Sequence, residues 1–596
     1  MRNYKKKNAI LLTIFLSFTA INIGFFFSNL NTLTPMVQTV FFNNPKTSAL
    51  HNTTVRIDDA NPAENWATAK AAGICTGTGT SSNPYIINND IFNVTSGTEC
   101  LYILNSRKYF RVLNCEFIIS GFAGGIVLTN TTNGLIEDNQ LPRGIFVNIL
   151  VDNCSQITLR DNNCSASGAG IALSDSDNII VDSNIVNDNF GIGITLDNCD
   201  DVVIEDNDVI RNTNQGVYFD NSEFVTIKSN TFINNSISVE NYISNNSKIL
   251  SNTITNSGNH GIRIFQSHRC EISGNTITLS SNDGIRVEQS THNLIKSNNV
   301  NDNFYGIHLI TNSEFNTISK NTAADNQDDG IYLDGADHNI IDQNTANNNG
   351  DEGFWTTNSD HHIVTGNKAY HNAGFGLRFN AGVNLTIKDN EAEQNTQAGI
   401  RLYNIDDSII ENNYAHHNGW DGFRFRSGSE RNIIQGNTAK FNNLSGFYIF
   451  EASNPSAVIQ NIASNNEEHG IYLETITNSL IIGNTANDNN LNGIYLRTCD
   501  GNSIVGNTAS GNINGTNLMW SNDNIISGNH LYGNMYCMNE SYSSGNLYSD
   551  NYCAPPPSVA LPLDPFILGL IIGLVIGFGV LAAVLIINLV RGRKKA

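Results

Sequence analysis

Short runs in which apolar and polar residues alternate recur along most of the chain at one spacing. In Gly284-Ile285-Arg286-Val287 the first and third residues after the glycine are apolar and the second is polar, and the same phrase returns at 330–333, 399–402 and 493–496. Because successive side chains of a β-strand point to opposite faces, this alternation predicts strands with one buried and one exposed face. The second position after the glycine then faces solvent.

The glycine that opens this phrase marks a repeat of 22 to 25 residues, and we count about 19 units. It stands at positions 125, 170, 193, 216, 261, 284, 306, 330, 353, 376, 399, 422, 446, 470, 493 and 515, with Cys100, Asn148 and Ser238 in its place elsewhere. A unit this short cannot hold a helical repeat, and its strand has no partner inside the unit. It therefore pairs in parallel with the same strand of the next unit, which predicts an all-β solenoid of two or three parallel sheets, on the order of 90 Å long.

An asparagine follows the glycine after fourteen or fifteen residues in unit after unit. Asparagine tolerates tight turns, and stacked amides can hydrogen-bond from one coil to the next. We expect an inward ladder with a structural role, formed by Asn139, Asn184, Asn230, Asn275, Asn298, Asn321, Asn344, Asn367, Asn413, Asn437, Asn484 and Asn507.

The repeats occupy residues 100–530, and both ends of such a solenoid need a cover over the open sheet edge. Residues 31–99 hold the first strands and a predicted helical cap, in which Asn61 caps a helix, Gly73 ends it, and Trp66 turns onto the first coil. Residues 531–565 are predicted to form a C-terminal cap and a proline-rich stalk.

The two termini carry segments typical of membrane targeting. Residues 1–30 begin with basic side chains and continue with apolar ones, as in a signal peptide or signal anchor. Residues 566–590 form an apolar stretch long enough to cross a bilayer, and the basic tail 591–596 predicts a cytoplasmic end. We therefore expect a cell-membrane protein with a single C-terminal transmembrane helix and its bulk extracellular or periplasmic.

Charge excludes one class of partner. Acidic residues number 55 against 33 basic ones, which gives a net charge of −22. A chain this acidic is repelled by nucleic acid phosphates, so nucleic acid is not an expected partner.

Ten cysteines and many Asn-x-Ser/Thr triplets fit an oxidising location and a glycoprotein. Cys154, Cys199 and Cys499 all lie six residues after their unit's first position, where other coils carry small residues, and are expected to be packed thiols. Cys75 with Cys100 and Cys537 with Cys553 are the predicted disulfides, one in each cap. The acceptor asparagines include Asn93, Asn130, Asn153, Asn163, Asn234, Asn384, Asn443, Asn514 and Asn539.

A family resemblance rests on two stretches. Gly79-Thr80 followed by Asn83 to Ile87, together with repeats such as 483–496, resembles the NosD-like right-handed parallel β-helix proteins. The resemblance covers about residues 75–550 and implies a right-handed parallel β-helix of the kind found in carbohydrate-binding proteins and sugar hydrolases. The namesake is a periplasmic protein related to copper, but no motif of metal ligands accompanies the repeat in this chain.

The exposed second position of successive strands carries an arginine-rich and aromatic column, which we call the stripe. Aromatic faces stack on sugar rings and guanidinium groups pair with carboxylates, so the stripe suits an extended, acidic glycan. The alternative is that these side chains stack on one another and stiffen the sheet. The stripe consists of Arg263, Arg286, His308, Tyr332, Trp355, Arg378, Arg401, Arg424, Tyr448, Tyr472 and Tyr495.

Acidic residues precede the stripe on the neighbouring turn. Asp329 and Glu352 occupy the same position in adjacent coils, close enough to act as acid and base or to hold Ca²⁺. With Arg378 they form the candidate catalytic group, and the alternative is a set of solvated turn carboxylates. Apart from Ca²⁺, no cofactor is expected.

Histidines suggest a weaker metal candidate. His338 and His361 share one turn position in neighbouring coils, and His292 lies in the same column. No third ligand is evident there, and exposed turn histidines are the favoured interpretation. His371 and His416-His417 allow the same two interpretations.

These patterns favour a membrane-anchored surface binding or structural protein whose partner is a polysaccharide or another cell-surface polymer. The first alternative is a polysaccharide-active enzyme: a lyase, hydrolase or epimerase. The second is a NosD-like copper-related periplasmic factor.

Overall fold

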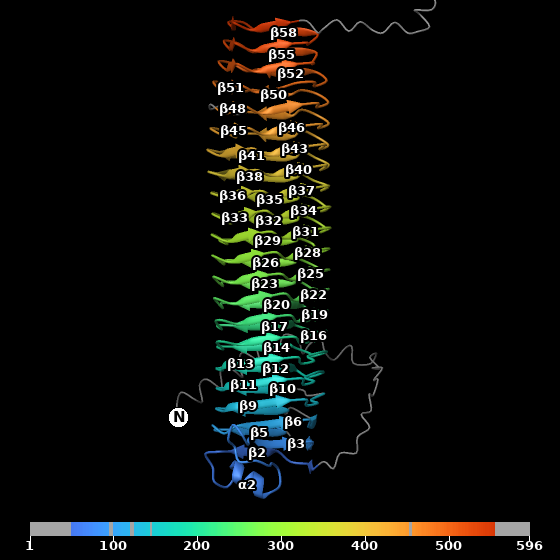
Figure 1. The fold of residues 1–596 in the computed structure, drawn as a ribbon, viewed down its shortest axis with the longest axis vertical. Coiled ribbons are helices and arrows are strands. Elements are labelled where there is room, and N and C mark those ends of the chain that lie inside the picture. Colours follow the sequence, from blue (N-terminus) through green and yellow to red (C-terminus); the bar gives the residue numbers. More distant parts are fainter. Residues whose placement is uncertain (1–48, 95–98, 120–123, 143–145, 452–455, 555–596) are drawn as a thin grey trace, which may run out of the picture. The chain divides into compact units, whose positions relative to one another are not determined.

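The computed structural model describes residues 49–94, 99–119, 124–142, 146–451 and 456–554 (Figure 1). These residues form an all-β parallel solenoid of about 20 turns, with β2 (Val55–Asp58) near its blue end and β58 (Tyr536–Ser541) near its red end. Each coil contributes a strand to each of two long sheets, and most coils contribute one to a third. The predicted all-β solenoid of parallel sheets is confirmed.

The sheet that contains the glycine phrase, here called the face sheet, has 21 strands among the described residues. Every strand between the two end strands pairs in parallel with the strands of the coils before and after it, for example Ile262 with Ile285 and Ile285 with Ile307. A second sheet runs in the same way from β3 (Tyr85–Asn88) to β59 (Leu547–Ser549). The third contains an uninterrupted run from β16 (Asp208–Ile210) to β49 (Ile462–Ser464).

The recurring glycine is required by close approach between coils. A Cβ on Gly284 would lie 2.8 Å from the carbonyl oxygen of Gly306 and 2.2 Å from Cγ1 of Val300. The same clash recurs at Gly330, where the carbonyl oxygen of Gly353 is 2.7 Å away. The two following apolar positions are buried, so the glycine marks the point where the strand enters the core.

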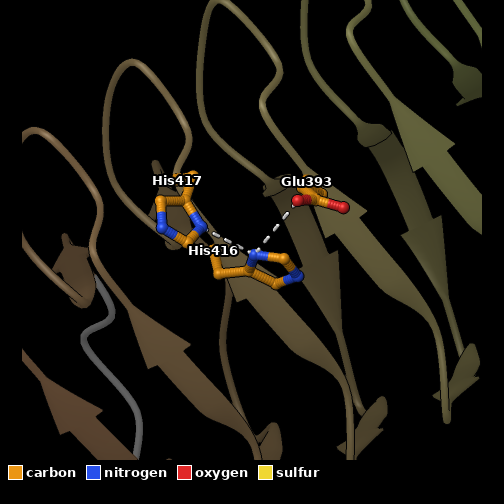
Figure 2. A group of neighbouring side chains, drawn as sticks. All are labelled: Glu393, His416 and His417. Atoms are coloured by element: carbon orange, nitrogen blue, oxygen red, sulfur yellow. Dashed lines mark hydrogen bonds and ion pairs between the residues drawn. The ribbon is translucent and has the colours of Figure 1, made fainter.

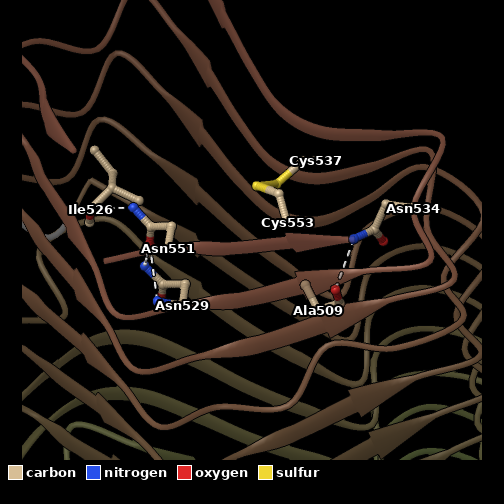
Figure 3. Close-up of a disulfide and its surroundings, with 7 residues drawn as sticks. All are labelled: Ala509, Ile526, Asn529, Asn534, Cys537, Asn551 and Cys553. Carbon is tan, nitrogen blue, oxygen red and sulfur yellow. Dashed lines mark hydrogen bonds between the residues drawn. A yellow bond between two sulfur atoms is a disulfide. The ribbon is translucent and has the colours of Figure 1, made fainter. Parts of the chain in front are cut away.

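The predicted asparagine ladder is present and continuous from Asn139 to Asn551. Each side-chain Nδ2 donates to the Oδ1 of the next coil, as Asn298 does to Asn321 at 3.0 Å, and also to a backbone carbonyl, here Ile272 at 2.8 Å. Figure 3 shows its last step, from Asn529 to Asn551. Buried amides with every step paired stabilise the turn, at about 1 kcal/mol per hydrogen bond.

A second asparagine ladder runs from Asn303 to Asn534 at the turn between the third sheet and the face sheet. Asn349, for example, donates to Asn372 at 2.9 Å. This ladder was not predicted, although asparagines recur nineteen or twenty residues after the glycine in the sequence. It packs beside the recurring glycine: Nδ2 of Asn349 lies 2.7 Å from a Cβ placed on Gly330.

The N-terminal part contains a short helix, α2 (Trp66–Ala71). Its N-cap is Asn65, whose side chain accepts a hydrogen bond from the Thr68 amide, so the predicted cap at Asn61 is wrong by one turn. Trp66 is buried, donates from Nε1 to the Ser106 hydroxyl at 2.9 Å and stacks on Tyr85, with ring centroids 4.8 Å apart.

Membrane segments fall outside the part of the chain that is described. The predicted signal segment 1–30, the transmembrane helix 566–590 and the tail 591–596 all lie there, as does most of the stalk. Within the described ranges, no helix is both long and apolar enough to cross a membrane.

One predicted disulfide forms and the other does not. Cys537 and Cys553 are bonded, with Cα atoms 5.7 Å apart (Figure 3). Cys75 and Cys100 are both free and buried, so the predicted bridge between them is wrong. Cys75 packs under α2 with its thiol 3.8 Å from the Trp66 carbonyl, while Cys100 enters the core before the next face-sheet strand. Cys154, Cys199 and Cys499 are free and buried, as expected.

Candidate functional site

The stripe is one column of side chains in register across eleven strands. Every member pairs with the next, from Arg263 opposite Arg286 to Tyr472 opposite Tyr495. Ten are partly exposed; His308 is buried beneath Tyr305 and Tyr332. The strands are β23 (Ile262–Phe265), β26 (Ile285–Glu288), β29 (Ile307–Ile310), β32 (Ile331–Asp334), β35 (Phe354–Thr357), β38 (Leu377–Val383), β41 (Ile400–Asp406), β44 (Phe423–Arg426), β47 (Phe447–Phe450), β50 (Ile471–Glu474) and β52 (Asn492–Arg497).

Stacking runs along much of the column. The rings of Tyr332 and Trp355 lie 4.5 Å apart, and the Arg378 guanidinium lies 4.6 Å from the Trp355 ring centroid. Tyr448, Tyr472 and Tyr495 follow one another at 4.9 Å. Each contact contributes about 0.5 to 1.5 kcal/mol, so the column does brace the sheet.

The middle of the stripe is hollowed. A depression of about 340 Å³ spans the coils of β35 to β44 and is lined in part by Arg401. Phe375 and Trp420, which precede the glycines of their coils, form its wall, with ring centroids 5.7 Å apart in an edge-to-face contact. The hollow is lined by Asp351, Glu352, Phe375, Arg378, Gln397, Arg401, Trp420, Arg424 and Arg426.

Positive charge exceeds its local compensation in this hollow. Arg378 pairs with Glu352 at 2.6 Å and Arg424 pairs with Asp421 at 2.6 Å. Arg401 makes no ion pair with any described residue and rests instead over the Phe375 ring at 4.9 Å. Burial and the neighbouring Arg378, Arg424 and Arg426 lower the pKa of Arg401 to about 10.

Arg426 adds a second uncompensated group. Its guanidinium lies 5.3 Å from the Phe450 ring centroid, and its Nε is buried without a hydrogen-bond partner. Nε1 of Trp355 is buried and unpartnered as well. More than nine in ten buried polar groups in proteins are paired, so these donors are available to a ligand or to water.

The predicted acidic group lies at one end of the hollow. Glu352 and Asp329 are both buried, and Oδ1 of Asp329 accepts a hydrogen bond from the Glu352 amide at 2.9 Å. No N–H or O–H group of the described residues donates to Oδ2 of Asp329 or Oε2 of Glu352, and the side chains of Asp329 and Asp351 both approach Glu352. Asp329, Glu352 and Arg378 are therefore brought together as predicted, although only Glu352 and Arg378 line the hollow.

Two neighbouring carboxyls titrate far from their ordinary range. Burial and the adjacent Glu352 raise the pKa of Asp329 well above 3.8. Burial raises the pKa of Asp351 as well, with a further contribution from Glu352. Asp351 lines the hollow together with Glu352, so a ligand can contact both carboxyls.

The charged side chains at the N-terminal end of the stripe have ion-pair partners. Asp283 is buried and meets His260, His308 and Arg286 at 3.1 to 3.2 Å, and the two histidines hold its pKa below the ordinary value against the opposing effect of burial. Arg263 lies between Glu240 and Glu288. The contrast with Arg401 places the candidate site in the hollow rather than along the entire stripe.

The metal candidates at His338 and His361 are a stacked pair. Their rings lie 4.5 Å apart and 2° from parallel, and Phe315 stacks on the other side of His338. Ring nitrogens carry their lone pairs in the ring plane, so parallel stacked imidazoles do not converge on one ion. His362 is separate: it is buried, and its Nδ1 accepts the Asn339 amide at 3.1 Å.

Four lining residues, Phe375, Gln397, Trp420 and Arg426, were missed from the sequence. Phe375 and Trp420 stand one and two residues before their glycines, outside the strand phrase. Arg426 is the fourth residue after Gly422, an exposed position by the same alternation that identified the stripe. Examining the fourth position after the glycine together with the second identifies Arg426.

Two family models match the chain. That described as right handed beta helix region matches residues 99–242 and 305–463, about half of the sequence. That described as periplasmic copper-binding protein (NosD) matches residues 240–329 and 422–554. No curated protein matches the sequence.

Solved structures with a similar arrangement share little sequence with this chain. The Dettilon tailspike protein is 16% identical, with a TM-score of 0.31, over 55% of this chain and 62% of that one. The A-module of a mannuronan C-5 epimerase from Azotobacter vinelandii is 16% identical, with a TM-score of 0.31, over 56% and 86%. PfbA, a surface adhesin of Streptococcus pneumoniae, is 14% identical, with a TM-score of 0.22, over 56% and 85%.

Proposed function

Because this chain belongs to the right-handed β-helix family, whose stacked strands form long exposed sheets, we propose that it binds an extended acidic polysaccharide, or another carboxylate-bearing surface polymer, on the outer side of the face sheet. The ligand lies along the stripe, with its tightest contacts in the hollow around Arg401. Coils about 4.8 Å apart present similar groups at regular intervals, an arrangement that suits a polymer better than a small molecule.

The observation that carries this proposal is the unpaired Arg401. A guanidinium half-buried among three others, on a chain of net charge −22, is stabilised when an anion enters the hollow. A carboxylate accepts two parallel hydrogen bonds from a guanidinium, and the Phe375 and Trp420 rings beside it suit the apolar face of a sugar. Together they match a uronic acid unit.

The proposal includes a place and an attachment for the protein. The NosD model is described as periplasmic, which supports an extracytoplasmic location. In this proposal residues 1–30 direct export, residues 566–590 anchor the chain in the membrane, and α2 covers the first coil, where Trp66 is buried.

Glycan binding tests the proposal directly. The purified protein is applied to an array of acidic and neutral glycans, and each hit is repeated with Arg401→Ala. The variant is expected to lose at least about tenfold in affinity for acidic glycans, because a hydrogen bond to a charged group contributes about 1.5 to 3 kcal/mol. Equal binding of acidic and neutral glycans, or an unchanged affinity in the variant, contradicts the proposal.

A matched control separates the site from the net charge. Arg211→Ala removes the same charge from an exposed arginine that pairs with Asp188 at 2.7 Å, away from the face sheet. This variant is expected to bind as the parent does. A loss equal to that of Arg401→Ala would show that only the total charge matters.

A second candidate function is catalysis on the bound polymer, as a lyase, hydrolase or epimerase. Asp351, with its raised pKa, is placed to exchange a proton with a ligand in the hollow, and Arg378 holds Glu352 beside it at 2.6 Å. When no cation is bound, Asp329 keeps its proton and positions the pair. Incubation of a bound glycan with the protein, followed by mass spectrometry and NMR of the products, is expected to show cleavage or epimerisation that Asp351→Asn abolishes while binding persists.

A further inference from the structure

A group of metal-ligating side chains lies on the third sheet, apart from the stripe. It consists of Glu393, at the end of β40 (Glu391–Glu393), and His416 and His417, at the end of β43 (Tyr414–His416) (Figure 2). One ligand atom of each lies within 4.8 Å of the others. We propose that these three side chains bind a divalent transition-metal ion, Zn²⁺ or one of similar preference.

The backbone explains how two consecutive histidines reach one point. Neighbouring residues within a strand point to opposite faces, so a His-His pair inside β43 would diverge. His417 instead has a φ of 55°, which ends the strand and turns its ring to the side of His416. The two Nδ1 atoms are 2.9 Å apart and aimed at one another.

The carboxylate comes from the adjacent coil. Glu393 is in register with His416, and its Oε1 lies 3.8 Å from His416 Nδ1. Imidazole nitrogens and a carboxylate oxygen form the donor set that suits Zn²⁺ and its neighbours, with a remaining position for water. The Nδ1 to Nδ1 distance leaves room for an ion after a small rotation of the exposed His417 ring.

A second carboxylate orients His416. Oε1 of Glu391 lies 3.5 Å from His416 Nε2, and the other oxygen of Glu391 accepts a hydrogen bond from the Tyr370 hydroxyl at 3.1 Å. A proton on Nε2 that points to Glu391 leaves the Nδ1 lone pair free toward the shared point. Metal-bound histidines usually have such a carboxylate behind them. Glu391 is thus a positioning residue.

Burial distinguishes this group from exposed turn histidines. His416 is only 7% exposed, because it stacks against Tyr414 with ring centroids 4.1 Å apart and is covered by His417. Two lysines lie in register with the group: Lys440 follows His416 in the next coil, and Lys368 precedes Glu391 and pairs with it at 3.6 Å. His371 stands at the turn position of His417 two coils earlier, where the residue in register with His416 is Tyr370.

Titration of the full chain with Co²⁺, followed by competition with Zn²⁺, tests the site. Ligand-field absorption of Co²⁺ reports the number and type of its ligands. One ion per chain is expected to bind at micromolar concentrations or below and to be displaced by Zn²⁺. His417→Asn and Glu393→Gln should each weaken binding at least about tenfold. Asparagine is the residue found at this turn position in another coil, Asn348, so the fold tolerates it.

Two further variants define the outcome. His371→Asn, at the matched position without a histidine neighbour, is expected to bind as the parent does. Glu391→Gln is expected to weaken binding about tenfold or more while the Co²⁺ spectrum keeps its shape. The proposal is overturned if the parent binds no ion up to about 1 mM, or if His417→Asn binds as tightly as the parent.

Discussion

Replacing Arg401 with methionine is expected to make the protein more stable and its binding weaker. Methionine keeps the unbranched stem and its contact with the Phe375 ring while removing a charge that has no partner among the described residues. The pKa of Arg401 is lowered from 12.5 to about 10 by burial and the neighbouring arginines. That difference corresponds to about 3 kcal/mol, which solvent screening of a half-buried group reduces to a net gain of about 1 kcal/mol.

The same substitution at Arg378 is expected to make the protein less stable. Arg378 is the ion-pair partner of Glu352, which is 1% exposed, so Arg378→Met leaves a buried carboxylate without its cation. Removing one member of a buried ion pair costs about 3 to 5 kcal/mol. Replacing two arginines that lie one coil apart in one column thus changes the stability in opposite directions, because only one of them has an ion-pair partner.

Urea unfolding followed by circular dichroism, with binding to the best acidic glycan measured on the same preparations, checks both signs. If the stripe serves only to stiffen the sheet, Arg401→Met loses a cation–π contact and becomes less stable, and no binding is lost. A destabilised Arg401→Met with unchanged affinity would therefore refute the assignment of the hollow as a ligand site.

Three further outcomes are expected. Burial lowers the pKa of His362 to about 4 from its ordinary 6.5. The neutral imidazole therefore stabilises the fold above about pH 6.5, and this contribution is lost as the pH falls toward 4. His362→Asn, which restores the asparagine of its column, should make the unfolding midpoint depend less on pH across this range. Replacing Cys537 and Cys553 with serine should destabilise the last coils by about 3 kcal/mol, seen as faster amide exchange after residue 530, whereas free thiols in the native protein would contradict the bond. Ca²⁺ is expected to bind the carboxylates of Asp328, Asp329 and Asp351 and to raise the thermal midpoint of the parent but not of Asp329→Asn; equal shifts in both would exclude this site.

The regular repeat allowed most of the fold to be predicted from the sequence. Alternation after Gly284 set the buried and exposed faces, and the asparagine at plus fourteen identified a turn, because both signals repeat in nearly every coil. Cys75 and Cys100 lie where the repeat is not yet regular, so their distance could not be inferred from register. The His416 and His417 pair was equally hidden, since its convergence depends on a positive φ at one residue.

The sequence alone could have predicted that Arg401 has no ion-pair partner among the described residues. Asp283 and Asp421 stand just before their glycines and pair with the arginine of their own coil. Glu352 stands at the same position and pairs with Arg378 of the next coil. For Arg401 the corresponding residues are Ala398 and Phe375, which carry no charge. A comparison of these two columns predicts which arginine lacks a counter-ion.

That comparison also bears on why the stripe exists. Stacking occurs along much of its length, from Tyr332 on Trp355 to Tyr472 on Tyr495, and sheet bracing is sufficient to explain those parts. Bracing does not explain a guanidinium left without a carboxylate at Arg401, because pairing it requires only an acid in place of Ala398, as in the coils of Asp283, Glu352 and Asp421. The arrangement is disadvantageous for the free protein, and it is resolved when an anion enters. The charge pattern therefore favours a ligand in the hollow, and the stacked columns on either side are the rigid frame that holds it open.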